Sequence, residues 1–309
     1  MNAIKYILIC GAGMMGKNIA FVMASNPAYQ VGVYDLYETD VPGGIRANTR
    51  QLIAKGALTE EELDARLSRI SFTTDLDSEL VSRADLVIEA VFEDMKIKRE
   101  TFAKLEARCR PDTIFCTNSS VMSPSEISAE LRHRERFVGT HFWNPGHLIP
   151  LVEVVKSDAS SDETAQTVME VLSSAGKEPV LCKKDVPGFI ANRMQHALWR
   201  EAISIVERGI ADAATVDKAV RYSFGLRLPQ LGPMENADMV GTDLTYNIHD
   251  YILKDLEDSH EPSPLLTRLR DEGKLGFKTG EGFQKWTNEE MDQVRDDLNT
   301  YLIRMLYGK

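Results

Sequence analysis

One histidine and one glutamate are spaced so that they could carry out acid–base chemistry. His141 lies in the segment Thr140–Pro145 (THFWNP), and Glu153 follows 153 − 141 = 12 residues later in the apolar run 151–155. A single histidine near a strand end is commonly structural, and an unpaired glutamate on a buried strand is costly. If the carboxylate binds one imidazole nitrogen, both difficulties disappear and the other nitrogen becomes a base near neutral pH. The pair therefore predicts proton transfer at His141, oriented by Glu153.

A glycine-rich turn near the start has the spacing of a nucleotide-binding loop. It consists of Gly11, Ala12, Gly13, Met14, Met15 and Gly16. The turn follows an apolar run and opens a helical pattern, and that context makes a GxGxxG sequence meaningful. Its first glycine forms the tight turn, the second lets the backbone approach a pyrophosphate, and the third lets helix and strand pack closely. The new helix N-terminus then faces the phosphates with free N–H groups.

An acidic residue completes the nucleotide signature. Asp35 ends the next apolar run, 35 − 16 = 19 residues after the last glycine. A carboxylate there accepts hydrogen bonds from ribose hydroxyls. Because Leu36 and Tyr37 follow instead of an arginine that would bind a 2′-phosphate, we expect NAD rather than NADP. The alternative is a turn that serves packing only, with Asp35 as a strand-end cap.

The elements that must position these residues alternate in the first half of the chain. Apolar runs rich in Val, Ile or aromatic residues predict strands at 6–10, 31–35, 86–91, 113–117 and 137–142, with two further strands at 151–156 and 179–181. Helical patterns lie between them, including one at 161–175. Such alternation predicts an α/β, mostly parallel sheet with helices on both faces. Residues 43–56 and 59–68 depart from this rhythm and predict an inserted helical pair, at about 43–69.

The second half contains helical patterns without strands. They cover 189–209, 213–224, 239–253, 264–272 and 289–306. We therefore predict two domains, a nucleotide-binding domain over 1–184 and an all-helical domain over 185–309. The helical domain is expected to carry substrate and dimer contacts.

Composition excludes several classes of partner. The 309 residues are 43% apolar and 27% charged, with a net charge of −11 and no long block of like charges. Nucleic acid and anionic membrane surfaces require clustered Lys and Arg, so neither is an expected partner. The first residues are too short an apolar stretch for a membrane span or signal peptide. Cys10, Cys109, Cys116 and Cys182 have no metal-ligand spacing, so we expect no metal and a reducing, cytoplasmic location.

Ordered motifs along nearly the whole chain resemble the 3-hydroxyacyl-CoA dehydrogenase family. They are GAGMMG, Asp35, ADLVIEAVFEDMKIK (84–98), TNSS (117–120), HFWNP with LVEVV, KDVPGFIANR (184–193), GPMENADMVGTD (232–243) and GFKTGEGF (276–283). The resemblance implies a Rossmann-type domain followed by a helical domain that usually dimerises. It also implies NAD as cofactor and oxidation of a 3-hydroxyl to a ketone.

The resemblance also assigns roles to individual residues. His141 becomes the general base and Glu153 its orienting partner, while Ser119 and Asn192 hold the substrate oxygen or steady the histidine. The cofactor contacts implied are Gly11, Gly13, Met14, Met15, Gly16, Asp35, Glu93, Lys98, Ser119, Asn144 and Lys278. Each also has a structural alternative: Lys98 and Lys278 as surface charges, Ser119 as a turn residue, and Asn192 as a helix cap.

The nature of the substrate stays open at this point. A 3-hydroxyacyl-CoA, as in fatty-acid metabolism, is the first expectation, and Asn48 and Lys55 in the helical pair are candidate contacts. However, Trp143 stands where acyl-CoA enzymes usually have Phe, and Pro150 stands where they commonly have Lys. With His147, these residues resemble relatives that act on free hydroxy acids such as carnitine, gulonate or a pyridine carboxylate. Trp143 and His147 are therefore candidate substrate contacts.

A non-catalytic protein is the alternative from another class. A structural or NAD-sensing member of the family would tolerate loss of His141 or Glu153, and this chain retains both. We therefore expect an enzyme with a small-molecule substrate, and a homodimer because the family usually forms one.

Overall fold

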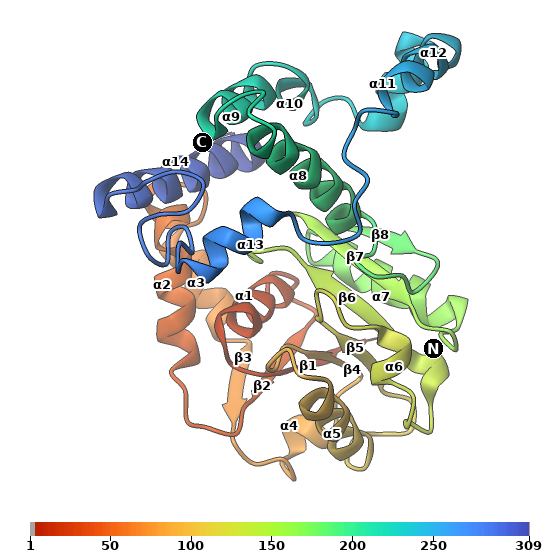
Figure 1. The fold of residues 1–309 in the computed structure, drawn as a ribbon. Coiled ribbons are helices and arrows are strands. Elements are labelled where there is room, and N and C mark those ends of the chain that lie inside the picture. Colours follow the sequence, from red (N-terminus) through yellow and green to blue (C-terminus); the bar gives the residue numbers. More distant parts are fainter. Residues whose placement is uncertain (1–3, 309) are drawn as a thin grey trace. The chain divides into compact units, whose positions relative to one another are not determined.

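The computed structural model describes residues 4–308, which form a single large sheet followed by helices (Figure 1). The strands are β1 Tyr6–Cys10, β2 Gln30–Tyr34, β3 Ile70–Thr73, β4 Leu86–Glu89, β5 Ile114–Thr117, β6 Phe137–Phe142, β7 Leu151–Lys156 and β8 Glu178–Cys182. Their spatial order is β3-β2-β1-β4-β5-β6-β7-β8. All neighbouring pairs are parallel except β6 and β7. The order reverses direction at β1, where doubly wound folds bind ligands.

Helices cover both faces of this sheet because side chains alternate along each strand. Ile7 and Ile9 of β1 point into one apolar cluster, together with Ile19 of α1 and Val168 of α7. Leu8 points into the other cluster, with residues of α4, α5 and α6. The helices concerned are α1 Met14–Met23, α2 Val41–Ala54, α3 Glu60–Leu67, α4 Glu79–Ser82, α5 Met95–Glu106, α6 Pro124–Ile127 and α7 Asp162–Ser174. The predicted mostly parallel α/β fold is confirmed.

The rest of the described chain is helical, as predicted. Its helices are α8 Ala191–Glu207, α9 Ala213–Arg221, α10 Phe224–Arg227, α11 Pro233–Val240, α12 Thr242–Ile252, α13 Pro264–Asp271 and α14 Asn288–Tyr307. The single helix predicted over 239–253 is wrong, because Gly241, at φ +103°, separates α11 from α12. Strand β3 also escaped prediction, since its side chains are only half-buried and form no apolar run.

By its contacts the chain forms two compact units. The first runs to Ala191 and also includes the residues from Asp297 onward, while the second spans Asn192–Asp296. The C-terminal residues join the first unit because Ile303 is buried within its larger apolar cluster. The boundary suggested by the sequence, between residues 184 and 185, stays a prediction. No helix within residues 4–308 combines the length and apolar character needed to cross a membrane.

Candidate active site

The parallel strands bring their carboxyl ends to one edge of the sheet, and several of the predicted catalytic and cofactor residues lie there. Gly11 follows β1, Asp35 follows β2, and Glu89 ends β4. Ser119 follows β5, and His141 is the second-to-last residue of β6. Because β5 and β6 are paired neighbours, Ser119 and His141 belong to adjacent strand ends.

The antiparallel pairing of β6 and β7 places the predicted catalytic pair, His141 and Glu153, side by side. His141 and Glu153 are register partners across the two strands. The Nδ1 atom of His141 lies 2.9 Å from Oε2 of Glu153. Both side chains are buried, at 5% and 0% exposure. The pairing of two neighbouring strands therefore brings together His141 and Glu153, which are twelve residues apart in the sequence.

The Glu153 carboxylate binds four donors. Its Oε2 accepts from His141 and, at 3.3 Å, from Nε1 of Trp143. Its Oε1 accepts from the backbone N–H groups of Ile190, at 2.9 Å, and Ala191, at 3.0 Å. Burial acts to raise the pKa of Glu153, but these hydrogen bonds hold the pKa below its usual value. An ionised Glu153 requires the proton of His141 on Nδ1, which leaves Nε2 as the free base.

Phe189, which the sequence analysis did not single out, completes the surroundings of His141. Its ring centroid lies 5.7 Å from that of His141, and Trp143 lies at 5.5 Å. Phe189 is buried and has φ +50°, a left-handed conformation that is uncommon for a bulky residue. The turn it forms leads directly into the Ile190 and Ala191 amides that bind Glu153. The sequence Pro187-Gly188-Phe189 was the only sign of this turn, because proline followed by glycine is typical of a turn.

A second buried network lies at the ends of β4 and β5. The ammonium group of Lys98 lies 2.7 Å from Glu89 and 3.2 Å from Glu93, and Thr117 donates to Glu89 at 2.7 Å. Burial raises the pKa of Glu89 despite these contacts. Burial also acts to raise the pKa of Glu93, but bonds from Ser119 and Lys98 outweigh it and lower that pKa. Lys98 is thus buried and is not a surface charge. The sequence did not single out its partner Glu89, because Glu89 is the last residue of an apolar strand.

The hydroxyl group of Ser119 already has two partners. It donates to Glu93 and accepts from the backbone N–H of Met122 at 2.9 Å. With its single hydrogen bound to Glu93, Ser119 offers a substrate a lone pair rather than a donor in this arrangement.

The glycine turn fits a dinucleotide. Gly11 has φ +109°, and a Cβ atom there would lie 2.7 Å from the carbonyl oxygen of Ala90. A Cβ atom on Gly16 would lie 1.8 Å from the oxygen of Gly11, whereas one on Gly13 would meet no atom within 4 Å. Gly11 and Gly16 are therefore required by packing. Gly13 leaves open space that a pyrophosphate could occupy, with Met14 and Met15 beginning α1 beside it.

The carboxylate of Asp35 lies beside this turn. It accepts from the amide of Ala12 at 2.6 Å and from that of Tyr37 at 3.2 Å. Each oxygen keeps a lone pair for a ribose hydroxyl, because each receives one donor from the protein. Together with the open space at Gly13, this arrangement fits the adenosine and pyrophosphate of NAD.

A buried lysine binds the carbonyl groups of the turn that follows β6. Lys177 donates to the carbonyl oxygens of Gly146, at 2.6 Å, and Ile149, at 2.7 Å. Burial lowers the pKa of Lys177 to about 8 and that of half-buried His147 to about 4. Nδ1 of His147 is buried and has no hydrogen-bond partner among the described residues. His147 is therefore a neutral ring in the turn that follows β6, and Asn144 is exposed in the same turn.

The remaining predicted residues are more dispersed. Asn48 on α2 donates to Asn18 on α1 at 2.8 Å, and Lys55 is exposed at the end of α2. Asn192 lies in the first turn of α8, and Lys278 is exposed in the loop before α14. Because both belong to the second unit, their roles stay predictions.

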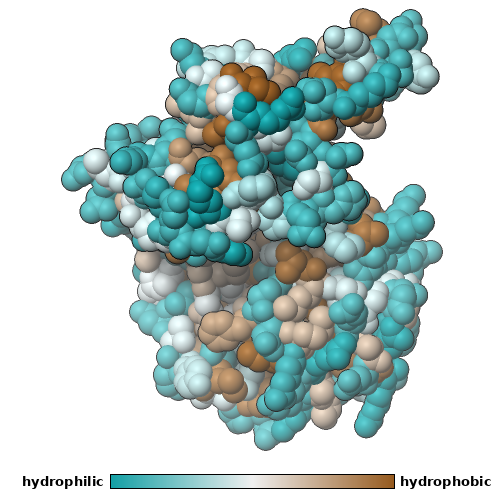
Figure 2. Space-filling model, in the orientation of Figure 1, coloured by the Kyte–Doolittle hydropathy of each residue, from teal (hydrophilic) through white to brown (hydrophobic). Residues whose placement is uncertain are grey.

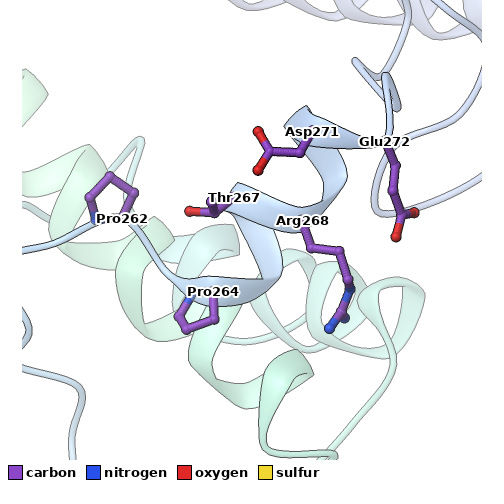
Figure 3. Close-up of a pocket in the computed structure, with 6 residues that line it drawn as sticks. All are labelled: Pro262, Pro264, Thr267, Arg268, Asp271 and Glu272. Carbon is purple, nitrogen blue, oxygen red and sulfur yellow. The ribbon is translucent and has the colours of Figure 1, made fainter.

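The second unit also has an open hollow on α13. Figure 3 shows that side chains from α13 and from the residues just before and after it line the hollow: Pro262, Pro264, Thr267, Arg268, Asp271 and Glu272. None of its lining residues is a predicted site residue, and the lining combines two prolines with one basic and two acidic side chains. Among residues 4–308, no three His, Cys, Asp or Glu side chains are grouped as metal ligands.

Family comparisons agree with this geometry. The sequence profile of the 3-hydroxyacyl-CoA dehydrogenase NAD-binding domain matches residues 6–186, and the profile of the C-terminal domain of that family matches residues 188–286. The chain is 37% identical over 294 residues to the mitochondrial hydroxyacyl-coenzyme A dehydrogenase of Homo sapiens, covering 92% of this chain and 91% of the human one.

A relative whose substrate carries no CoA aligns with more of this chain than the human enzyme does. The 5-formyl-3-hydroxy-2-methylpyridine 4-carboxylate 5-dehydrogenase of Mesorhizobium japonicum is 33% identical over 313 residues, 99% of each chain. A solved structure of a dehydrogenase with that substrate, an NAD+-dependent dismutase, has a TM-score of 0.89 at 32% identity and covers 99% of this chain and all of its own. The (S)-3-hydroxybutyryl-CoA dehydrogenase of Ralstonia eutropha has a TM-score of 0.77 at 29% identity and covers 93% and 100%.

Proposed function

The chain belongs to the 3-hydroxyacyl-CoA dehydrogenase family of NAD-dependent oxidoreductases, and on that premise we propose that His141 takes the proton of the hydroxyl group being oxidised. The observation that carries the proposal is the buried His141–Glu153 pair at 2.9 Å, placed at the same sheet edge as the glycine turn. General-base catalysis needs this arrangement, in which one imidazole nitrogen is held and the other is free.

The residues of the chain divide the reaction between them. The glycine turn and Asp35 would hold NAD, which would supply the hydride acceptor for the carbon that carries the hydroxyl group. His141 removes the hydroxyl proton through Nε2, and the ionised Glu153 stabilises the imidazolium that results. Trp143 and Phe189 flank the imidazole and limit the access of water to it. Ser119, whose hydroxyl proton is bound to Glu93, keeps a lone pair that can accept a hydrogen bond from the substrate or from the protonated histidine.

The substrate that we favour is a small hydroxy or formyl carboxylate without a CoA carrier. The likeness to the pyridine-carboxylate dehydrogenase extends over the whole chain, at a TM-score of 0.89 against 0.77 for the hydroxybutyryl-CoA enzyme. The same site can oxidise a formyl group once that group is hydrated. Loss of the O–H proton to His141 and of the C–H hydride from the same carbon then turns the hydrated aldehyde into a carboxylic acid.

A 3-hydroxyacyl-CoA is the second candidate, and it was the first expectation from the sequence motifs. The 37% identity to the human hydroxyacyl-coenzyme A dehydrogenase favours it. So does the exposed Lys55 at the end of α2, where a cation could meet a phosphate of a carrier.

A comparison of specificity constants tests the choice. NADH formation is measured with 3-hydroxybutyryl-CoA, carnitine, gulonate and 5-formyl-3-hydroxy-2-methylpyridine 4-carboxylate. We expect kcat/KM to be highest for one of the free acids. A kcat/KM at least tenfold higher for the CoA thioester would contradict that expectation, and no NADH from any of them would support the non-catalytic alternative.

Assembly and location are also part of the proposal. The second unit exposes many large apolar side chains, and Figure 2 shows hydrophobic surface in the region that contains α9 to α12 in Figure 1. Such surface supports a homodimer. A cytoplasmic location is supported by the four cysteines, all of them free thiols, although the human relative is mitochondrial.

A further inference from the structure

We propose that Trp143 is a positioning residue that adjusts the strength of the base His141 through Glu153. Its indole N–H donates to the same carboxylate oxygen that binds the histidine. The inference rests on the proposed function, because it concerns the residue that is proposed to remove the substrate proton.

The contacts at Glu153 carry the inference. Oε2 of Glu153 lies 2.9 Å from Nδ1 of His141 and 3.3 Å from Nε1 of Trp143. The other oxygen is taken by the amides of Ile190 and Ala191. A carboxylate has about four lone-pair directions, so the group is saturated by these donors. His141 and Trp143 therefore share one oxygen rather than binding one each.

Strand geometry explains how Trp143 reaches that oxygen. Residues two apart on an extended chain point to the same side, so the side chain of Trp143 follows that of His141. The two rings lie 5.5 Å apart with planes inclined at 56°. The indole N–H is a donor only and cannot replace His141 as a base. Its effect on the reaction must therefore pass through Glu153.

Because Trp143 binds the same oxygen, Glu153 stabilises the protonated form of His141 less strongly. A hydrogen bond from the indole offsets part of the negative charge on Oε2, so less of that charge stabilises a protonated imidazole. Removal of this donor strengthens the interaction between Glu153 and the protonated His141. The base then stays protonated to higher pH, and oxidation requires a more alkaline solution.

The substitution Trp143→Phe tests this effect because it keeps an aromatic ring and removes the donor. The acid limb of the pH dependence of kcat/KM is measured for wild type, Trp143→Phe and the control Trp199→Phe, whose indole lies beside His196 on α8. We expect the midpoint of Trp143→Phe to move to higher pH by roughly half a unit, because only a fraction of the energy of a hydrogen bond to a charged group passes through Glu153 to the histidine. The control midpoint should not move. A uniform loss of kcat/KM at every pH, with the midpoint unchanged, would contradict the proposal and show that Trp143 contributes only by packing against the site.

A second measurement separates this inference from the proposed function. The imidazole of His141 is titrated by NMR in the enzyme without substrate, with its signal identified by its loss in His141→Gln. We expect the same upward shift in Trp143→Phe, and little shift when Glu153→Gln is also present, because the carboxylate is then gone. If His141→Gln abolishes turnover but Trp143→Phe leaves the titration unmoved, only the inference fails. If His141→Gln keeps turnover, the proposed function itself fails.

Discussion

The imidazole of His141 can act as a base only when one nitrogen is held and the other is free. Glu153 holds Nδ1 at 2.9 Å, and the aromatic rings of Trp143 and Phe189 restrict the position of the ring. The sequence was sufficient to predict the pair His141–Glu153, because a carboxylate in an apolar run demands a partner. It was not sufficient to predict Trp143 as a second donor, which depends on how the chain continues past the end of β6. Nor could it predict Phe189 at positive φ, which depends on how a distant turn meets β7.

The ionisation of Glu153 leads to a prediction about stability. Its pKa is lowered in the folded chain, so its hydrogen bonds contribute stability above the ordinary value of 4.5, and this contribution is lost as the pH falls through the lower folded value. The variant Glu153→Gln does not ionise. We therefore expect the unfolding free energy of wild type to fall relative to that of Glu153→Gln as the pH drops below about 4.5. Urea denaturation at several pH values measures both free energies. A pH-independent difference would contradict an ionised Glu153.

The buried ion pair of Lys98 and Glu89 leads to a second prediction. The variant Lys98→Met leaves Glu89 without its cation in a fully buried place, which should lower the unfolding free energy by about 3–5 kcal/mol. The double variant Lys98→Met/Glu89→Gln should recover much of this loss, because the uncompensated charge is gone. Urea denaturation of both variants measures the effect. Equal stability of the single and double variants would show that the ion pair is not the cause.

The edge of the sheet is the element that assembles the site. The glycine turn after β1, Asp35 after β2 and His141 in β6 meet there because β1 to β6 are parallel. Alternation of apolar runs predicted nearly all of these strands to within two residues. The half-buried edge strand β3 and the break at Gly241 were missed, because the first lacks an apolar run and the second depends on a positive φ within a continuous helical pattern.

The glycines of the turn lead to a prediction that separates packing from cofactor binding. A methyl group at Gly16 would collide with the Gly11 carbonyl at 1.8 Å, whereas one at Gly13 would meet no protein atom within 4 Å. We expect Gly16→Ala to lower the thermal midpoint and Gly13→Ala to leave it unchanged. Titration with NAD should show a Kd raised at least tenfold in Gly13→Ala, because the methyl group takes the place of the pyrophosphate. Unchanged NAD affinity in a folded Gly13→Ala would contradict the assigned cofactor site.

At the scale of the whole molecule, the chain consists of two units with different surfaces. The first unit buries its apolar residues in two clusters around the sheet, and the larger cluster includes Ile303 of α14. The second unit leaves an apolar stripe on α12 exposed, formed by Leu244, Ile248, Tyr251 and Ile252 at positions i, i+4, i+7 and i+8. The helical patterns of this unit were predictable, but not the fact that α12 leaves such a face exposed.

That stripe leads to a prediction about assembly. Sedimentation should give a mass of 2 × 34.6 = 69.2 kDa for wild type, the mass of a dimer. The variant Tyr251→Glu places a charge on the stripe and should shift the chain toward the monomer. Tyr246→Glu is the matched control, because Tyr246 is exposed on the opposite side of α12. A monomeric wild type, or equal effects of the two variants, would contradict an interface on this stripe.

The central claim, that His141 is the general base of an NAD-dependent dehydrogenase, is tested most directly by the turnover of His141→Gln. NADH formation is measured under saturating NAD with the best substrate of the panel, and the thermal midpoint and the NAD affinity are measured on the same preparation. We expect kcat to fall on the order of 10²–10⁴-fold while stability and NAD binding stay close to those of wild type. A folded, NAD-binding His141→Gln with near-normal kcat would contradict the claim.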